Sequence, residues 1–126
     1  KDCDYVVLAL PLTPETKNSF GAEELEAMKS TALLVDISRG GIVDNSALKE
    51  AIEKKVIAGA ALDVFPEEPL PANSPLWKLP NVIISPHIGG VSTRYNQRAV
   101  KLFRENISRY LQKSPLFNRF DPEKGY

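Results

Sequence analysis

Side chains that bind acids or move protons stand directly after three apolar runs of this 126-residue sequence. Arg39 follows the first run, Glu67 and Glu68 follow the second, and His87, the single histidine, follows the third. A guanidinium group matches a planar carboxylate with two parallel hydrogen bonds. An imidazole exchanges a proton near neutral pH, and a carboxylate on its other nitrogen fixes its tautomer and favours its charged form. These residue types together can hold a carboxylic acid and transfer a proton at a neighbouring oxygen.

Proton transfer beside a bound carboxylate is one half of the interconversion of 2-keto acids and 2-hydroxy acids. The other half is a hydride transfer, which no side chain supplies, so this chemistry requires a nicotinamide cofactor. Each residue also has a simpler explanation. His87 alone would more often be a hydrogen-bonded structural residue, Arg39 could pair with a carboxylate at a helix start, and one of the adjacent glutamates would be a solvated charge. Their joint position after equivalent strands favours catalysis.

Alternating strands and helices are predicted to position these residues. Residues 21–30 and 44–55 each have one apolar face and predict amphipathic helices, the second capped by Asp44 or Asn45. Short apolar runs of the kind found in parallel strands buried on both faces lie at 4–10, 32–38, 57–65 and 81–85. This order predicts a doubly wound α/β sheet, in which loops at the carboxyl ends of the strands form the ligand crevice.

The rest of the chain predicts one loop, one long helix and a tail. The proline-rich segment 66–80 can form neither a long helix nor a central strand, and it predicts an ordered functional loop. Residues 93–113 predict a helix whose apolar stripe is covered by the sheet or by another domain; the stripe contains Ala99, Leu102, Phe103, Asn106, Ile107 and Tyr110. Residues 114–126 predict an irregular surface tail.

Composition excludes several classes of partner. Lys plus Arg and Asp plus Glu both number 16, so no basic field attracts nucleic acid or anionic membranes. Cys3 is the single cysteine and no Cys/His cluster exists, so neither a disulfide nor a metal site is expected. No apolar run approaches the roughly 20 residues of a membrane span, and the first residues are acidic where a signal peptide is basic. We expect a soluble, cytoplasmic protein.

Four segments carry a family resemblance: LALPLTPETKN, LVDISRGGIVD, AGAALDVFPEEPLP and LPNVIISPHIGG. In this order, over residues 1 to about 113, they resemble the nucleotide-binding domain of the D-isomer-specific 2-hydroxyacid dehydrogenases. The resemblance implies that Arg39 binds the substrate carboxylate and carbonyl. It also implies that His87 is the general acid/base and that Glu68, directly before Pro69, is its orienting carboxylate.

The same resemblance implies NAD or NADP as cofactor, with Asp63 contacting the nicotinamide carboxamide. Further cofactor contacts would fall at Leu10, Pro11, Thr16, the backbone of Ile37 and Ser38, Arg39, His87, Gly89 and Gly90. Local alternatives exist for several of these residues. Asp63 could cap a loop turn, Thr16 could be a turn residue, and the glycines could serve only tight turns.

The sequence departs from the family pattern in two ways. Asp36 stands where the family commonly has Asn, and the G-x-G-x-x-G turn with its NAD- or NADP-selecting residue is absent. Glu68 also differs from the Gln typical of formate dehydrogenases, which argues against that branch. We therefore expect residues 1–113 to be the second half of a Rossmann fold, without the G-x-G-x-x-G half or the substrate domain, inactive by itself and weak in cofactor binding.

The predicted function is an oxidoreductase that transfers a hydride between NAD(P)H and a 2-keto acid or D-2-hydroxy acid, as a homodimer by family habit. A different class remains open at this point. Transcriptional corepressors that resemble the same family sense NAD(H) through this fold and control protein association. Slow turnover on every 2-keto acid together with cofactor-dependent self-association would favour that alternative.

Overall fold

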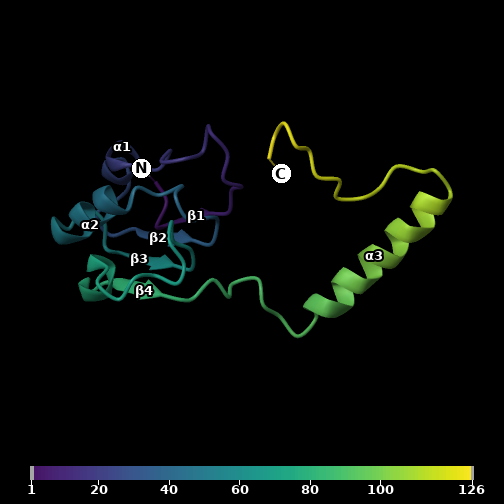
Figure 1. Cartoon of the computed structure of the whole chain (residues 1–126). Coiled ribbons are helices and arrows are strands. Elements are labelled where there is room, and N and C mark those ends of the chain that lie inside the picture. The colour runs from purple at the N-terminus through teal and green to yellow at the C-terminus, as the bar shows by residue number, and fades with distance from the viewer. Residues whose placement is uncertain (1, 126) are drawn as a thin grey trace. The chain divides into compact units, whose positions relative to one another are not determined.

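The computed structural model describes residues 2–125. Along the chain lie β1 (Tyr5–Leu8), α1 (Ala22–Glu26), β2 (Leu33–Asp36), α2 (Asn45–Glu53), β3 (Gly59–Leu62), the 3₁₀ helix η1 (Pro75–Lys78), β4 (Val82–Ile84) and α3 (Tyr95–Leu111). The elements are labelled in Figure 1. The chain packs as two units, an N-terminal unit up to Gly89 and a C-terminal unit from Gly90. The predicted assignment of residues 1–113 to one domain stays a prediction.

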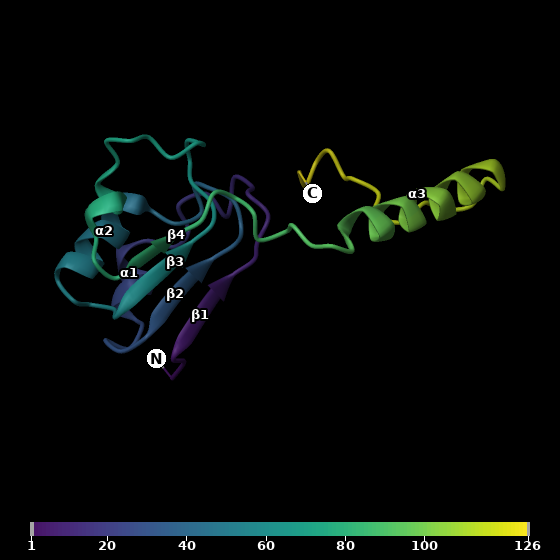
Figure 2. The ribbon, with the colours of Figure 1, turned by 90° about the horizontal axis from the view of Figure 1, so that it is seen from below.

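The N-terminal unit is built on a four-stranded parallel sheet in the order β1-β2-β3-β4, which Figure 2 shows face on. In its register, Leu34 lies opposite Val6 on one side and Ala60 on the other. Parallel neighbours require a crossover connection, and α1 and α2 supply the first two. The predicted parallel α/β architecture is confirmed.

The strands are shorter than the apolar runs predicted. The run 57–65 contains a strand of four residues, Gly59–Leu62, although Ile57 and Phe65 outside it are buried as well. Hydrophobicity reports burial, whereas a strand also needs a neighbour for each backbone group. Apolar runs therefore extend past the hydrogen-bonded ladder into buried loop ends.

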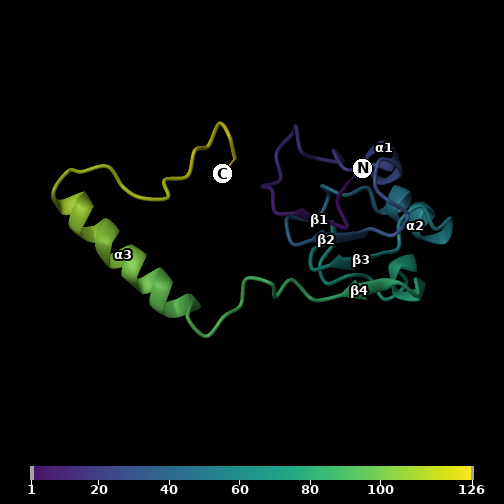
Figure 3. The ribbon, with the colours of Figure 1, turned by 180° about the vertical axis from the view of Figure 1, so that it is seen from behind.

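Both crossover helices pack on the same face of the sheet. Leu25 of α1 and Leu48 of α2 are fully buried in one cluster with Leu34 of β2, and Figure 3 shows both helices beside the strands. The strand order runs in one direction, and right-handed crossovers in one direction place their helices on one side. A doubly wound sheet contains two such halves, and the described strands and helices correspond to one of them.

The opposite face of the sheet is exposed, so the prediction of strands buried on both faces is wrong for these residues. Tyr5 is 65% exposed, Val7 56% and Ile83 72%. Side chains alternate between faces along a strand, and these three share the face that neither α1 nor α2 covers. Parallel sheets normally have both faces covered by other elements, which explains why the exposed side chains on this face are apolar.

Local capping explains where the crossover helices begin. The Asp44 side chain accepts hydrogen bonds from the backbone N–H groups of Ser46 and Ala47, which makes Asp44 the N-cap of α2. Helix α1 is shorter than predicted, because the N–H of Met28 bonds to the carbonyl of Leu25, three residues back, where an α-helix would bond four residues back. The predicted second helix is thus confirmed with small changes at its ends, and the first is only five residues long.

The C-terminal unit consists of α3 and the tail after it. None of the residues of α3 is buried, and the stripe residues Phe103, Ile107 and Tyr110 are exposed. Asn106 of α3 fastens the following segment to the helix by exchanging two hydrogen bonds with the backbone of Phe117. Among residues 2–125, no helix is long and apolar enough to cross a membrane.

Candidate active site

Backbone hydrogen bonds align the loops at the carboxyl edge of the sheet. The first residue after β2, β3 and β4 (Ile37, Asp63 and Ser85) donates its N–H to the carbonyl of the last residue of the preceding strand, at 3.1, 2.9 and 2.9 Å. Each loop therefore starts in register with its neighbour. The predicted polar residues leave the sheet from one common edge.

The histidine and one glutamate form a hydrogen-bonded pair at this edge. Nδ1 of His87 lies 2.8 Å from Oε2 of Glu68, and the second carboxylate oxygen accepts from the backbone N–H of Phe65 at 2.9 Å. The bond from His87 and then that from Phe65 hold the pKa of Glu68 below its ordinary value, against partial burial. The pair thus combines an ionised carboxylate with an imidazole whose Nε2 side is available for a substrate oxygen.

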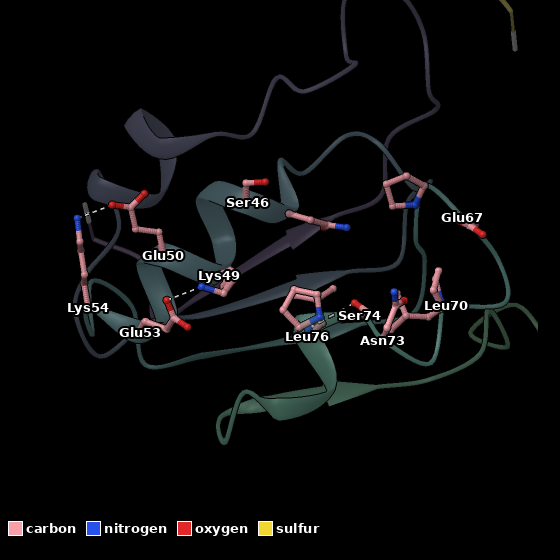
Figure 4. A pocket seen from close by; sticks show the side chains of 14 residues that line it. Ser46, Lys49, Glu50, Glu53, Lys54, Glu67, Leu70, Asn73, Ser74 and Leu76 are labelled. Atoms are coloured by element: carbon pink, nitrogen blue, oxygen red, sulfur yellow. Dashed lines mark hydrogen bonds and ion pairs between the residues drawn. The ribbon is translucent and has the colours of Figure 1, made fainter.

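The adjacent glutamate does not join this pair. Glu67 borders a separate cavity of about 740 Å³ between α2 and the proline-rich loop, shown in Figure 4. The walls of that cavity carry the ion pair of Lys49 with Glu53 and that of Lys54 with Glu50. None of the predicted catalytic residues borders it. The structure thus brings Glu68, and not Glu67, to His87, and the catalytic role of the pair stays a prediction.

A smaller cavity of about 490 Å³ adjoins the pair. His87 and Glu68 border it, and its other walls are mostly apolar, including Phe65 and Trp77. The indole N–H of Trp77 donates to the carbonyl of Pro71 at 2.9 Å, which holds the proline-rich loop in place. The pair itself stays partly open to solvent, because 42% of the His87 side chain and 35% of the Glu68 side chain are exposed.

Asp63 accepts three hydrogen bonds from the segment around His87. Its Oδ1 accepts from the Ser85 hydroxyl at 2.5 Å and from the N–H of Ile88 at 2.9 Å, and its Oδ2 accepts from the N–H of Gly89 at 2.7 Å. Burial opposes ionisation, but these hydrogen bonds outweigh it and hold the pKa of Asp63 below its ordinary value. The Asp63 carboxylate thus binds a segment distant in sequence, and its contact with a cofactor stays a prediction.

Arg39 lies in a loop that packs against the loop of Glu68. A Cβ atom on Gly40 would lie only 1.9 Å from the carbonyl oxygen of Phe65, so this approach requires glycine. The Arg39 guanidinium donates one bond, to the carbonyl of Ser38 at 2.7 Å. Within residues 2–125 no hydrogen bond joins Arg39 to His87 or Glu68. The other donors of the fork remain for a carboxylate ligand.

The unusual Asp36 supports the same loop. It is buried, and its Oδ1 accepts from both the N–H and the hydroxyl of Ser38. Burial raises the pKa of Asp36, and the bonds from Ser38 offset only part of that rise. An Asn side chain offers the same acceptor oxygen, so this departure from the family pattern preserves the local hydrogen bonding.

Two of the cofactor residues expected from the sequence, Leu10 and Ile37, offer apolar surface to a flat ring. Leu10 and Ile37 are about half exposed at the ends of adjacent strands, and Ile37 lies 3.9 Å from where a Gly89 side chain would begin. Exposed apolar side chains and a nearby glycine suit the flat face of a nicotinamide ring. The described residues hold no cluster of His, Cys, Asp or Glu that could bind a metal ion.

Among the remaining predicted contacts, Thr16 has a local role in the structure. The Thr16 hydroxyl donates to the carbonyl of Pro11 and accepts from the N–H of Thr13, both at 2.8 Å, so it organises its own turn. Gly90 is surrounded by open space, because a Cβ atom on it would meet no other atom within 4 Å. Cofactor binding by Pro11, Thr16, Ser38 and Gly90 stays a prediction.

A parallel α/β sheet with polar side chains gathered at its carboxyl edge is the arrangement typical of nucleotide-binding domains. A family model described as D-isomer specific 2-hydroxyacid dehydrogenase, NAD binding domain, matches residues 1–89. The chain belongs to this family, as its sequence motifs predicted.

Curated relatives have the same family character. The chain is 50% identical over 100 residues to a glyoxylate/hydroxypyruvate reductase B of Pectobacterium carotovorum, covering 78% of this chain and 31% of the relative. It is 45% identical over 107 residues to a glyoxylate reductase of Korarchaeum cryptofilum, covering 85% and 32%. The chain thus spans about a third of the length of these relatives.

Solved structures share the fold across nearly the whole chain. A D-isomer specific 2-hydroxyacid dehydrogenase of Xanthobacter autotrophicus Py2, in complex with NADPH and MES, matches with a TM-score of 0.88 and 41% identity over 98% of this chain and 50% of that one. An NADPH-dependent glyoxylate/hydroxypyruvate reductase of Sinorhizobium meliloti, in complex with NADP and sulfate, matches with a TM-score of 0.88 and 30% identity, covering 98% and 40%.

Proposed function

We propose that the protein carrying this chain is an NAD(P)-dependent oxidoreductase that interconverts a 2-keto acid and a D-2-hydroxy acid. The hydrogen-bonded pair of His87 and Glu68 carries this proposal, because it supplies a proton donor and acceptor at the edge of the sheet from which Arg39 also emerges. The names of the curated relatives support the reaction class.

The residues divide the work by their chemistry. Arg39 binds the substrate carboxylate with the donors that its bond to Ser38 leaves free. His87 donates a proton from Nε2 to the oxygen on C2 in reduction and accepts it in oxidation. Glu68 holds the imidazole through Nδ1 and stabilises its charged form. A bound nicotinamide cofactor supplies or accepts the hydride.

Small 2-keto acids such as glyoxylate and hydroxypyruvate are the proposed substrates, since the relatives are named for them. NAD or NADP is the proposed cofactor, and the dinucleotides in the two related crystal structures support it. We further propose a homodimer in the cytoplasm, a setting supported by the single free cysteine. The reductase names of the relatives give no support to the nucleotide-sensing alternative.

Steady-state turnover tests this proposal in the longest natural protein that contains the sequence. NADH and NADPH oxidation is followed with glyoxylate, hydroxypyruvate, pyruvate and bulkier 2-keto acids. The substitution His87→Gln is expected to lower kcat by about 10²–10⁴-fold, the usual contribution of a general acid, with little change in cofactor affinity. Lys78→Gln is a suitable control, because Lys78 is an exposed residue of η1. Equal, feeble rates in wild type and His87→Gln would contradict the proposal.

A further inference from the structure

Asp63 bonds to Ser85, Ile88 and Gly89, the residues that flank His87 of the proton-transfer pair. We propose that Asp63 is a positioning residue, whose carboxylate clamps the chain segment on both sides of His87, by a side-chain hydroxyl before it and by two backbone N–H groups after it, and thereby sets the position of its ring against Glu68. The catalytic meaning of this role rests on the proposed function. The clamp itself is a property of the fold.

The backbone conformation of His87 needs external support. Its φ is +54°, in the left-handed region that residues with a side chain seldom adopt. Such a conformation costs free energy and persists where the surroundings determine it from several directions. A relaxed backbone at this position would redirect the Cα–Cβ bond and move Nδ1 away from Glu68.

Three donors from the segment converge on the Asp63 carboxylate and supply that support. One comes from Ser85, two residues before His87, and two come from Ile88 and Gly89, the two residues after it. Both carboxylate oxygens take part, so the carboxylate fixes the segment on both sides of the histidine. Bonds from backbone N–H groups to an ionised carboxylate are among the stronger hydrogen bonds in proteins.

The clamp is rigid at its base. Asp63 is only 5% exposed and follows β3 directly, where its N–H bonds to the carbonyl of Asp36 on the neighbouring strand. Glu68 is held separately, by the N–H of Phe65. The two members of the pair are thus anchored at different points of the segment that follows β3, and Asp63 controls only the histidine side.

Gly89 makes the close approach possible. A Cβ atom built on it would lie 2.8 Å from Oδ2 of Asp63, a distance that requires one of the two groups to move. The absence of a side chain lets the Gly89 N–H come within 2.7 Å of that oxygen. Gly89→Ala is therefore an independent way to disturb the clamp without removing the carboxylate.

The imidazole ¹⁵N spectrum tests the clamp without any assay of turnover. In neutral His87, the bond to Glu68 places the proton on Nδ1, and ¹⁵N chemical shifts distinguish this tautomer from the one protonated on Nε2. A His87→Gln sample identifies the signals. We expect Asp63→Asn to shift His87 toward the Nε2-protonated tautomer, because the amide NH₂ cannot replace an acceptor, and Gly89→Ala to do the same.

Asp44→Asn is the matched control, since Asp44 also accepts two backbone N–H bonds but caps α2. It is expected to leave the His87 spectrum unchanged. If Asp63→Asn does not fold, Gly89→Ala decides. An unchanged tautomer in every folded clamp variant would overturn the proposal. In another outcome, the tautomer shifts in the clamp variants while the wild-type protein turns over no 2-keto acid. That result would contradict the proposed function and leave the clamp standing.

Discussion

His87 and Glu68 meet across 19 residues of sequence, with Nδ1 and Oε2 2.8 Å apart. Glu68 belongs to the proline-rich loop after β3, and His87 to the loop after β4. The contact exists because the two strands are parallel neighbours whose ends lie side by side. The pair is the centre of the predictions that follow.

Removing the charge of Glu68 should change the pH dependence of catalysis. Gln keeps an oxygen that accepts from His87 and Phe65 but carries no charge, so Glu68→Gln tests the electrostatic effect alone. Ionised Glu68 favours the protonated imidazole. In the reduction direction, where the proton is donated, the fall of kcat/KM with rising pH should therefore move to lower pH. An unmoved pH–rate profile would show that Glu68 does not act on His87.

Shortening the donor fork of Arg39 should weaken substrate binding. Lys has one ammonium group and cannot form two parallel bonds to a carboxylate, so Arg39→Lys should raise the KM for the 2-keto acid about tenfold or more. The KM for the nicotinamide cofactor serves as the internal control and should change little. An unaltered KM for the acid would argue against Arg39 as the carboxylate ligand.

Acid should destabilise the fold through Asp63 and Glu68. Both carboxyl groups have pKa values lowered by hydrogen bonds in the folded state. Each therefore contributes stability above its unfolded pKa of about 4, and this contribution is lost as pH falls through the lower folded pKa. Urea unfolding between pH 7 and pH 3 should show this loss, with a smaller loss in Asp63→Asn. An equal pH dependence in both proteins would count against the assignment.

Asp36 should act in the opposite direction. Its pKa is raised by burial, so its ionisation disfavours the folded state as pH rises through its unfolded value toward its folded value. Asp36→Asn keeps the acceptor for Ser38 and removes the buried charge. The variant should be more stable than wild type at pH 7, with the difference shrinking below the unfolded pKa. Chemical denaturation of both proteins at pH 7 and at a pH below about 4, the unfolded pKa of Asp, measures this difference in stability. A variant less stable than wild type at pH 7 would refute the prediction.

Neighbouring leucines on opposite faces of β2 should differ in their contribution to stability. Leu34 is fully buried and Leu33 is 36% exposed. Leu34→Ala leaves a cavity in the core and should cost about 2–5 kcal/mol of unfolding free energy. The same substitution at Leu33 is the control and should cost less than about 1 kcal/mol. Equal losses from urea denaturation would mean that the face of Leu33 is covered.

Much of the fold follows from local patterns. The four apolar runs predict the strands, the spacing of Leu48 and Ile52 predicts α2, and a cap at Asp44 or Asn45 predicts its start, because periodicity and capping are properties of neighbouring residues. The ends of the strands and the exposed sheet face do not follow from these patterns. Pairing and cover depend on contacts between elements that are distant in sequence.

The candidate site divides in the same way. The sequence by itself determined the residue types at the strand ends, and its motifs predicted Glu68 rather than Glu67 as the partner of His87. Only the tertiary structure placed the Asp63 carboxylate beneath the His87 segment, with bonds to residues 22 to 26 positions away. No local pattern predicts those bonds. They arise because parallel pairing brings the end of β3 beside the end of β4, and the left-handed backbone of His87 turns the following N–H groups toward one carboxylate.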